Sequence, residues 1–555
     1  MSLNNAPGEF GRATLTSTTD DDTVDSNVTL RFEVQTRPQN PWNSGLRYRA
    51  ECDLPPRAEL MIRFTARTLS AQTESGLASA RVYFETDGGS YDKSLFERVE
   101  IGRTAREYAF AFRSARQYRA GQYAFGLFFG DLVQSVEISN LELILNPDAS
   151  NLPPRELYPG SEPHAQWRRE AQERIEQYRK GDLTLNLRHA DGSPAVDATV
   201  SIVEKRSAFQ WGTCVVAARL LDASPDGEKY RDFIENYCDI VVFENDLKWF
   251  AWQNARARER VDQALQWLER HNIAVRGHCL VWPSWRNSNP MWKDAAESPE
   301  KLRKLINEHI LEEASQLQGR LVDWDVVNEP YDNRDIWQIL GKSELASWYK
   351  LARQADPNAR LYLNDYGILS AEGLDRRKHD FYYQTAQELL NAGAPLGGLG
   401  MQGHFGYPFT PPERMLEILN RMAELNLPIA ITEHDVDTQD EELHAQFTRD
   451  FMTVAFSCPA VDKFLLWGFW ERAHWRPNAA LYTSDWQLKP AGEVFTTLVG
   501  QTWRTNLETK TNSDGVCQQR VFLGDYEITA ELQGKRVQCY APVRHDSTEI
   551  TVVLP

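Results

Sequence analysis

The sequence predicts an α/β protein built on a closed (β/α)8 TIM barrel, with two antiparallel β-sandwiches attached. Between about residues 207 and 500, short apolar strands alternate with amphipathic helices. Strands of period two fill the region before residue 148, and two short strand-rich segments flank the alternating region. At 555 residues the chain is too long for a single hydrophobic core, so several domains are expected.

The charge balance disfavours two classes of partner. Asp and Glu number 79 against 61 Lys and Arg, which gives a formal net charge of −18. This excess opposes binding to nucleic acid phosphates or anionic lipids, so we expect neither nucleic acid nor a membrane as a partner. No stretch approaches the roughly 18 apolar residues of a membrane span. The first 22 residues show neither the basic nor the apolar region of a secretory signal.

The region before the linker, residues 1–148, predicts an antiparallel β-sandwich. Apolar and polar residues alternate over six runs that are separated by turn residues, without helical periodicity. The runs cover residues 28–35, 59–68, 78–86, 106–114, 122–130 and 134–145.

A linker and a helix are expected over residues 149–181. The stretch NPDASNLPPRELYPGSEP is rich in Pro, Ser and other turn-forming residues, as is typical of linkers. The charged stretch HAQWRREAQERIEQYRKGD predicts a helix, with Gly181 in the C-cap position.

The barrel is predicted over residues 207–500. Strands that are apolar on both faces and alternate with helices indicate a parallel sheet, and eight such units over about 290 residues fit a closed barrel. An open doubly wound sheet is the alternative, but no Gly-rich phosphate turn follows the first strand. The eight strands are AFQWGT, CDIVVFEN, IAVRGHC, LVDWDVVNE, RLYLND, LGGLGMQ, LPIAITE and DKFLLWG.

The segments on either side of the barrel, residues 182–206 and 501–555, predict two parts of one small β-sandwich. Neither segment has enough strands to bury a core by itself. Together they resemble the transthyretin-like or carboxypeptidase-regulatory β-sandwich through the stretches GSPAVDATV and GDYEITA. We therefore expect a split domain into which the barrel is inserted. Cys517 and Cys539 lie in the second segment and are either a disulfide or two free thiols.

The chemistry is expected at the carboxyl ends of the barrel strands, where the active sites of such barrels lie. Any one polar residue there is usually part of an ordinary solvated loop, but a set that converges on one rim indicates a site. The strand-end residues are Glu244, Asn245, Lys248, His278, Trp282, Asn328, Glu329, Asn364, Asp365, Gln402, His404, Glu433, Asp435, Trp467 and Trp475.

Two carboxylates on separate strands, Glu329 and Glu433, supply the pair that glycoside hydrolysis requires. One carboxyl protonates the leaving oxygen, and the other attacks or stabilises the anomeric carbon. Two residues at one rim can reach the ~5–5.5 Å separation of a retaining pair. Asn328, beside Glu329, can form a hydrogen bond with a sugar 2-hydroxyl that strengthens in the transition state.

Glu433 is expected to depend on two supporting residues, Asp435 and His404. Asp435 follows Glu433 by two residues, so both side chains point to the same side of an extended strand. The like charge would raise the pKa of Glu433 unless a donor lies between the two carboxylates, and His404 is the candidate for that bridge. Indole faces suit the stacking of sugar rings, and the candidates for this are Trp282, Trp467 and Trp475.

A metal site is the competing interpretation of this rim. Barrel hydrolases use strand-end histidines and carboxylates as ligands, and the candidates here are His278, His404, His434 and His474. However, no His-x-His occurs at the first strand, no Cys/His set has zinc spacing, and Asn328-Glu329-Pro330 suits no ligand role. We therefore expect no metal.

The motifs at these strand ends resemble those of glycoside hydrolase family 10, the retaining xylanases. In order they are FENDLKW, RGHCLVW, WDVVNEP, LYLNDY, GMQGH and ITEHDVD, followed by a Trp-rich last strand, over about 290 residues. The resemblance implies endo-hydrolysis of β-1,4-xylan without a cofactor, with Glu329 as acid/base and Glu433 as nucleophile. It also implies that the glycone subsites are lined by Glu244, Asn245, Lys248, His278, Trp282, Asn328, Gln402, His404, Trp467 and Trp475.

On the same basis, the expected partner is xylan or a xylo-oligosaccharide, and the expected location is extracellular or periplasmic. The N-terminal sandwich is similar to carbohydrate-binding modules of families 4, 9 and 22 in PWNSGLRYRAECDLPPRAELMIRFTART and QSVEISNLELI. Trp42 is its candidate ligand-stacking residue. Alternatively, this sandwich only packs on the barrel.

The chain departs from the family pattern around the predicted glycone subsites. Trp282 is followed by Pro283-Ser284-Trp285, where His, a small residue and Gln are usual. The other departures are His434, Gly367, Trp470 and Glu471. Two alternatives therefore stay open: a retaining hydrolase of another β-1,4-glycan or exo-acting on short xylo-oligosaccharides, and a non-catalytic carbohydrate-binding protein.

Overall fold

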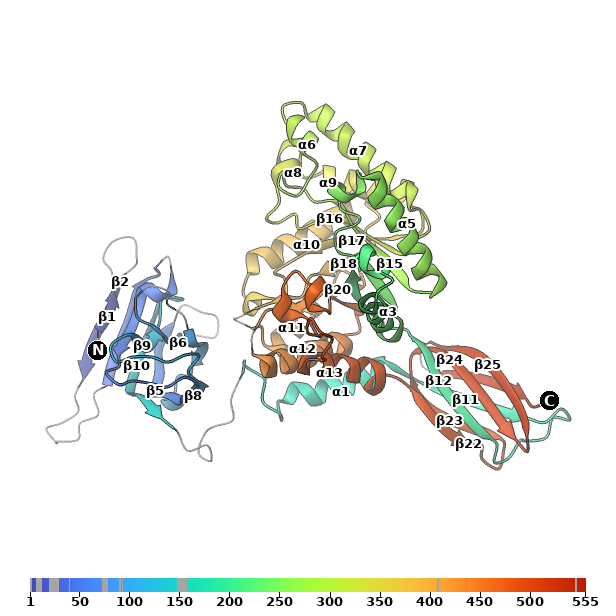
Figure 1. Ribbon diagram of the computed structural model, residues 1–555, viewed down its shortest axis with the longest axis horizontal. Coiled ribbons are helices and arrows are strands. Elements are labelled where there is room, and N and C mark those ends of the chain that lie inside the picture. The colour runs from blue at the N-terminus through green and yellow to red at the C-terminus, as the bar shows by residue number, and fades with distance from the viewer. Residues whose placement is uncertain are drawn as a thin grey trace. The chain divides into compact units, whose positions relative to one another are not determined.

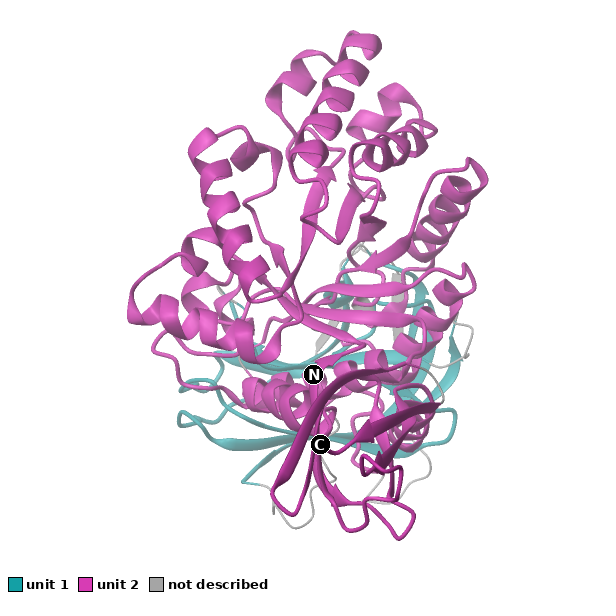
Figure 2. Cartoon of the chain, turned by 90° about the vertical axis from the view of Figure 1, so that its right-hand side faces the viewer, with its two compact units in different colours: residues 1–156 teal, residues 157–555 magenta. Residues whose placement is uncertain are grey.

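The computed structural model describes residues 2–5, 12–18, 29–38, 40–71, 78–88, 91, 93–146, 157–406, 409–438, 440–544 and 547–555. The chain forms two compact units, residues 1–156 and 157–555 (Figure 2). Among the described residues, no helix is both long and apolar enough to cross a membrane.

The first unit is the predicted antiparallel β-sandwich. Its described residues form two five-stranded sheets, in the orders β1-β4-β9-β6-β7 and β2-β3-β10-β5-β8. The strands are β1 (Ser2–Asn5), β2 (Arg12–Thr18), β3 (Thr29–Thr36), β4 (Ser44–Arg49), β5 (Glu59–Ala71), β6 (Ala78–Thr86), β7 (Lys93–Ile101), β8 (Arg106–Arg113), β9 (Tyr123–Phe128) and β10 (Gln134–Leu145). Apolar side chains from both sheets form the core, as the period-two pattern requires. Trp42 is 49% exposed, on the short 3-10 helix Pro41–Asn43.

The last residues of the predicted linker stretch belong to the second unit. Its residues 147–156 lie outside the described residues, but the next residues pack in the second unit. Tyr158 is buried and its hydroxyl donates to Asp450 at 2.6 Å. Helix α1 (Gln166–Tyr178) follows as predicted, but Gly181 does not cap it. The helix ends at Tyr178, and Gly181 lies inside strand β11 (Lys180–Arg188).

The second unit contains the predicted closed barrel (Figure 1). All eight predicted strands are present and pair in parallel, and pairing between β18 and β20 closes the sheet. The strands are β13 (Gln210–Val215), β14 (Ile240–Phe243), β15 (Ala274–Val281), β16 (Asp323–Asn328), β17 (Arg360–Asp365), β18 (Gly398–Met401), β20 (Ile429–Val436) and β21 (Val461–Leu466). A short strand, β19 (His404–Phe405), also pairs with β20.

Amphipathic helices cover the barrel and pack their apolar sides against the strands in one continuous core. Their bounds are α2 (Ala217–Leu220), α3 (Pro225–Tyr237), α4 (Trp249–Trp252), α5 (Ala255–Arg270), α6 (Pro290–Asp294), α7 (Pro299–Gln316), α8 (Asp335–Leu340), α9 (Glu344–Ala355), α10 (Arg376–Asn391), α11 (Pro412–Ala423), α12 (Glu441–Ser457) and α13 (Pro490–Thr497).

The two segments that flank the barrel join in one small β-sandwich. Strand β11 pairs with β23 and β26, and β12 (Thr199–Ser207) pairs with β22 and β24. Figure 1 shows β11 and β12, drawn in cyan and green, among the red C-terminal strands. Cys517 and Cys539 are both free thiols. The C-terminal strands are β22 (Asn506–Lys510), β23 (Val516–Phe522), β24 (Gly524–Leu532), β25 (Lys535–Val543) and β26 (Ser547–Val553).

Glu204 ties the two segments together where the chain enters and leaves the barrel. Its backbone N–H donates to the Thr505 carbonyl at 2.9 Å, and its side chain accepts from the Thr505 N–H at 2.8 Å. The side chain is buried, and burial raises the pKa of Glu204 to about 7 despite these hydrogen bonds. Folding therefore favours the protonated carboxyl at this junction.

This raised pKa predicts that stability falls as pH rises. Between about pH 4.5 and 7 the unfolded chain loses this proton before the folded chain does, so the free energy of unfolding decreases by on the order of 2–3 kcal/mol. Glu204→Gln cannot ionise, so its melting temperature should exceed the wild type's by a margin that grows from pH 5 to pH 8. Glu531→Gln, at an exposed position of β24, is the matched control. Equal margins at both pH values would contradict this account.

Candidate active site

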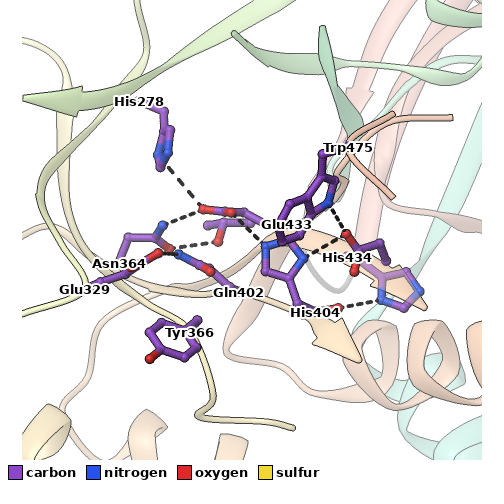
Figure 3. Close-up of polar contacts among 12 residues, drawn as sticks. His278, Glu329, Asn364, Tyr366, Gln402, His404, Glu433, His434 and Trp475 are labelled. Atoms are coloured by element: carbon purple, nitrogen blue, oxygen red, sulfur yellow. Dashed lines mark hydrogen bonds and ion pairs between the residues drawn. The ribbon is translucent and has the colours of Figure 1, made fainter. Parts of the chain in front are cut away.

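The predicted site residues converge at the carboxyl ends of the barrel strands (Figure 3). Asn328 ends β16, Asn364 is the last residue but one of β17, and Glu329 follows β16 directly. Strand β20 does not end where its apolar run does. It continues to Val436, so Glu433 and Asp435 are held by the sheet and are buried. The structure therefore places Glu433 within β20 and Glu329 directly after β16.

Glu329 is half-buried and lies among neutral donors. Trp282 Nε1 and Asn333 Nδ2 donate to its Oε2 at 3.1 and 3.2 Å, and Gln402 Nε2 donates to its Oε1 at 2.9 Å. Its backbone has a φ of 55°, a left-handed conformation that is uncommon outside glycine. The Glu329 N–H donates to the Asn364 carbonyl at 2.7 Å, which holds that conformation in place.

Glu433 lies between an amide and an imidazole. Asn364 Nδ2 donates to its Oε1 at 2.8 Å, and His404 Nε2 lies 3.0 Å from its Oε2. Asn364 is itself oriented, because Thr432 Oγ1 donates to its Oδ1 at 2.8 Å. The same Asn364 Nδ2 also donates to Asn328 Oδ1 at 2.9 Å, so one amide links the two strand ends.

His404 forms the predicted bridge between Glu433 and Asp435. Its Nδ1 lies 2.9 Å from Asp435 Oδ2, and its Nε2 faces Glu433 on the other side of the ring. Trp475 Nε1 donates to the same Asp435 oxygen at 2.6 Å, and Arg476 Nη1 lies 3.5 Å from the other oxygen. The imidazole is thus held from both nitrogens by buried carboxylates.

The pKa values of the two glutamates shift in opposite directions. Burial raises the pKa of Glu329, and the negative charge of Glu433 raises it further. Burial would also raise the pKa of Glu433, but hydrogen bonds from His404 and Asn364, with the charges of His404 and His278, bring it below its usual value. Burial disfavours the charged imidazole, yet Asp435 and Glu433 raise the pKa of His404 to about 9. Near neutral pH, Glu433 is therefore ionised beside a cationic His404, while ionisation of Glu329 is disfavoured.

A second buried network holds His278. Its Nδ1 lies 2.9 Å from Asp325 Oδ2 and 4.0 Å from Glu433 Oε1. Arg276 pairs with Asp325 through a short contact and lies 3.7 Å from Asp323. Asp323 in turn accepts a hydrogen bond from Lys463 at 2.6 Å. These partners fix the imidazole beside Glu433.

Glu244, Asn245 and Lys248 form one polar group after β14. Lys248 Nζ donates to Asn245 Oδ1 at 3.0 Å and lies 5.2 Å from the Trp282 ring. Burial raises the pKa of Glu244, opposed by the charge of Lys248. Because Trp282 also donates to Glu329, the group continues directly into the pair of carboxylates.

Trp467 and Trp475 flank the imidazoles. Trp467 is buried and meets the rings of His278 and His404 edge-on, at 5.3 and 6.1 Å. Trp475 is 49% exposed and lies 5.0 Å from the His404 ring, and the Arg476 guanidinium lies over its ring at 4.2 Å. Trp470, by contrast, is buried and stacks on Trp486 at 4.6 Å.

Several residues contribute to the site in ways that the sequence did not predict. Asn364 stood out only as a strand end, and Asn333 carries no motif although it lies four residues after Glu329. Lys378, on α10, bonds Asp332 at 2.8 Å and lies 3.2 Å from Asp365. A lysine within a charged helix gives no sign in the sequence that it approaches an active site.

The metal interpretation gains no support from the geometry. Within the described ranges, the side chains of His, Cys, Asp and Glu form no cluster of three or more that could hold a metal ion. His434 instead faces the Gly403 carbonyl at 3.1 Å, and His474 accepts from the Arg476 N–H at 3.0 Å.

Comparison with known proteins matches the barrel. The model of glycosyl hydrolase family 10 matches residues 201–497. Anti-sigma-I factor RsgI6 of Acetivibrio thermocellus is 31% identical over 376 residues, 67% of this chain and 47% of that protein. Endo-1,4-beta-xylanase 1 of Arabidopsis thaliana is 28% identical over 381 residues, 68% of this chain and 39% of that protein.

Among solved structures, xylanase 10B of Thermotoga petrophila RKU-1 in complex with xylobiose is 25% identical. The match covers 53% of this chain and 95% of that one, with a TM-score of 0.48. The chain spans less than half the length of the two curated relatives named above.

The bridge predicts that the pKa of His404 depends on Asp435. In Asp435→Asn the imidazole loses one of its two carboxylate partners, so the pKa of His404 should fall from about 9 by about 1 pH unit or more. NMR titration of protein carrying 13C-labelled histidine, with His404→Gln to assign the resonance, measures this value. An unchanged His404 titration in Asp435→Asn would show that Asp435 does not sustain the imidazolium.

Proposed function

Because the chain belongs to glycosyl hydrolase family 10, we propose that it is an endo-1,4-β-xylanase that cleaves internal β-1,4-xylosidic bonds of xylan with retention. Relatives named as endo-1,4-beta-xylanases support the choice of substrate. One relative is named as an anti-sigma-I factor, so the catalytic part of the proposal rests on the residues of this chain.

The observation that carries the proposal is the pair of glutamates at one rim of the barrel, whose different surroundings displace their pKa values in opposite directions. A glycosidase needs a protonated carboxyl and an ionised carboxylate at the same pH, and neighbouring environments of different kinds provide them. Glu329 has neutral donors around it and a raised pKa, whereas Glu433 faces a cationic imidazole and has a lowered one. This difference supports the acid role for Glu329 and the nucleophile role for Glu433.

In the first step, the Glu433 carboxylate attacks the anomeric carbon of the glycone sugar. The bond from that carbon to the leaving oxygen breaks, and Glu329 gives its proton to that oxygen. The product is a covalent ester between the sugar and Glu433, together with the released leaving sugar. As charge leaves Glu433, its attraction to His404 weakens, so the bridge to Asp435 keeps the imidazolium stabilised throughout.

In the second step, the ionised Glu329 takes a proton from a water molecule, which attacks the same anomeric carbon. The ester bond breaks, and Glu433 is again a carboxylate and Glu329 again an acid. Two inversions give net retention. The raised pKa of Glu329 assists both steps, because it favours the protonated acid in the first step and makes the carboxylate a stronger base in the second.

The glycone sugar is expected to lie against the polar group after β14 and the indole of Trp475. Asn328 is fully buried, and within the described residues its Nδ2 has no hydrogen-bond partner. That open donor beside Glu433 and Glu329 suits a 2-hydroxyl of the sugar. The proposed glycone contacts are Glu244, Asn245, Lys248, His278, Trp282, Asn328, Gln402, His404, Trp467 and Trp475.

The alternatives weighed from the sequence have less support. A non-catalytic binding protein has no use for a buried, internally paired ionised carboxylate, which is costly to keep without a function. Trp470 is bulky, but its side chain packs in the interior against Trp486. Its bulk is therefore no reason to favour exo action. Since xylan is a polymer outside the cell, we also propose an extracellular or periplasmic location.

The nucleophile assignment predicts that Glu433→Ala abolishes hydrolysis of xylan, with turnover reduced by about four orders of magnitude or more. Reducing-end release from xylan measures the rate, and circular dichroism and the melting temperature show whether the variant folds. A folded Glu433→Ala protein with near-normal turnover would refute the assignment.

The acid/base assignment predicts that the effect of Glu329→Ala depends on the leaving group. Cleavage of xylan should slow by about 10²–10⁴-fold, because the departing sugar oxygen needs a proton. The burst of released phenol from a dinitrophenyl β-xylobioside should slow far less, because that leaving group needs no protonation. Equal losses on both substrates would assign the proton transfer to another residue.

A further inference from the structure

A cavity lies where the small β-sandwich joins the barrel, next to α3 (Figure 1). Its volume is about 120 Å³, and it opens to solvent. It is built at the amino ends of β13, β14 and β15, whereas the candidate active site lies at the carboxyl ends of the strands. We call it the junction cavity, and its lining includes Glu204, Arg206, Trp211, Asp239, Asn272 and Arg504.

Strand β14 separates the junction cavity from the active site. Asp239 precedes this strand and lines the cavity, and Glu244 follows it at the opposite rim. Over five steps of about 3.3 Å each, the two residues lie about 16 Å apart along the strand. A molecule in the cavity is therefore out of reach of Glu329 and Glu433.

Groups of opposite charge line the junction cavity without forming ion pairs. In the part of the chain that the structure describes, neither Arg206 nor Arg504 has a carboxylate within ion-pair distance, and Asp239 has no cation that close. Burial raises the pKa of Asp239 to about 6, although the charges of Arg504 and Arg206 lower it. The three groups thus attract one another at a distance, as expected for side chains on separate walls of a cavity.

Backbone carbonyls fix the two guanidiniums. Arg504 donates from Nε and Nη2 to the carbonyls of Glu204 and Lys205, at 3.3 and 3.2 Å. Arg206 donates from Nη2 to the Asn272 carbonyl. Within the described residues, the Nη1 nitrogen of either arginine has no hydrogen-bond partner, so both keep donors available.

Other polar atoms of the lining are also unsatisfied within the described residues. Trp211 Nε1 and Glu204 Oε1 are buried and have no hydrogen-bond partner. Asp239 Oδ2 accepts from the Trp211 backbone N–H at 3.3 Å, and its other oxygen accepts no hydrogen bond. The cavity wall therefore presents both donors and acceptors, which a bound molecule can satisfy.

These groups decide which class of ligand the cavity suits. An apolar ligand would leave the donors and acceptors unpaired. Asp239 opposes an anion, and the two arginines oppose a cation. A hydroxyl group carries no charge and both donates and accepts. A cavity of about 150 Å³ holds a benzene ring, so the junction cavity has room for about one small ring and not for two.

We propose that the junction cavity binds a small neutral polyol, of the size of one sugar ring. Hydroxyls of the ligand donate to Asp239 and accept from Arg206 and Arg504. The arginines stand where the chain enters and leaves the barrel, and Asp239 belongs to the barrel itself, so the bound polyol joins the small sandwich to the barrel. This inference does not rest on the proposed function, because the two sites lie at opposite ends of the strands.

Hydrogen–deuterium exchange of the full chain, with and without 100 mM D-xylose, tests the site. Peptides that cover residues 204–211 and 499–505 report on the cavity, and a peptide that covers residues 429–436 reports on the active site. For a dissociation constant of about 10–50 mM, 100 mM ligand should slow exchange in the cavity peptides about three- to tenfold, because the ligand binds only the closed form.

Two variants remove the groups that the ligand contacts. In Asp239→Asn and in Arg504→Met, the slowing of the cavity peptides should largely disappear. Any slowing of the active-site peptide should stay as in the wild type. Asp232→Asn is the matched control, because Asp232 is exposed on α3 and does not line the cavity. Its exchange should respond to D-xylose as the wild type's does.

A disaccharide, trehalose, controls for the general stabilisation of proteins by excluded polyols. It is too large for the cavity, so it should slow the cavity peptides far less than D-xylose does. The inference is overturned if D-xylose does not slow these peptides, if trehalose slows them equally, or if the slowing persists in both folded variants. A stronger effect of acetate or glycine than of D-xylose would also overturn it, because the cavity would then prefer an anion or a zwitterion.

Discussion

The site depends on one constraint, the stabilisation of an ionised carboxylate in the barrel interior. Glu433 is buried at the end of β20, where its negative charge is costly unless donors and a countercharge surround it. His404 provides the countercharge. Asp435 holds His404 from the other side of the ring, and Trp475 donates a hydrogen bond to Asp435. Much of the polar structure at this rim follows from that requirement. The same arrangement makes Glu329 harder to ionise, so one network sets the protonation states of both carboxyls.

Much of the fold could be predicted because local sequence patterns determine it. All eight barrel strands are apolar runs between amphipathic helices. The carboxyl ends of the strands meet at one rim in such a barrel, so the sequence alone was enough to predict that the site residues lie together. The His404 bridge followed from the two-residue spacing of Glu433 and Asp435. The end of α1 was predicted wrongly, because Gly181 reads as a cap but the chain is already in β11 there.

The rest of the site depends on contacts between segments that are distant in sequence. Lys378 reaches Asp332 and Asp365 from a helix whose pattern shows only an ordinary charged face. Trp470 looked like an obstruction in the cleft, but a partner more than ten residues away, Trp486, gives it an interior place. Pairing of this kind is decided by tertiary packing, which a single sequence does not encode locally.

The central claim is that Glu433 forms a covalent bond with the sugar, and trapping that bond tests it most directly. A dinitrophenyl 2-deoxy-2-fluoro-β-xylobioside has a leaving group good enough for the first step. Its fluorine, however, destabilises the positive charge of both transition states, so the ester accumulates. Mass spectrometry of the digested protein should find the fluorosugar on the peptide that contains Glu433. An adduct on another residue, or rapid turnover through inversion without an adduct, would contradict the account.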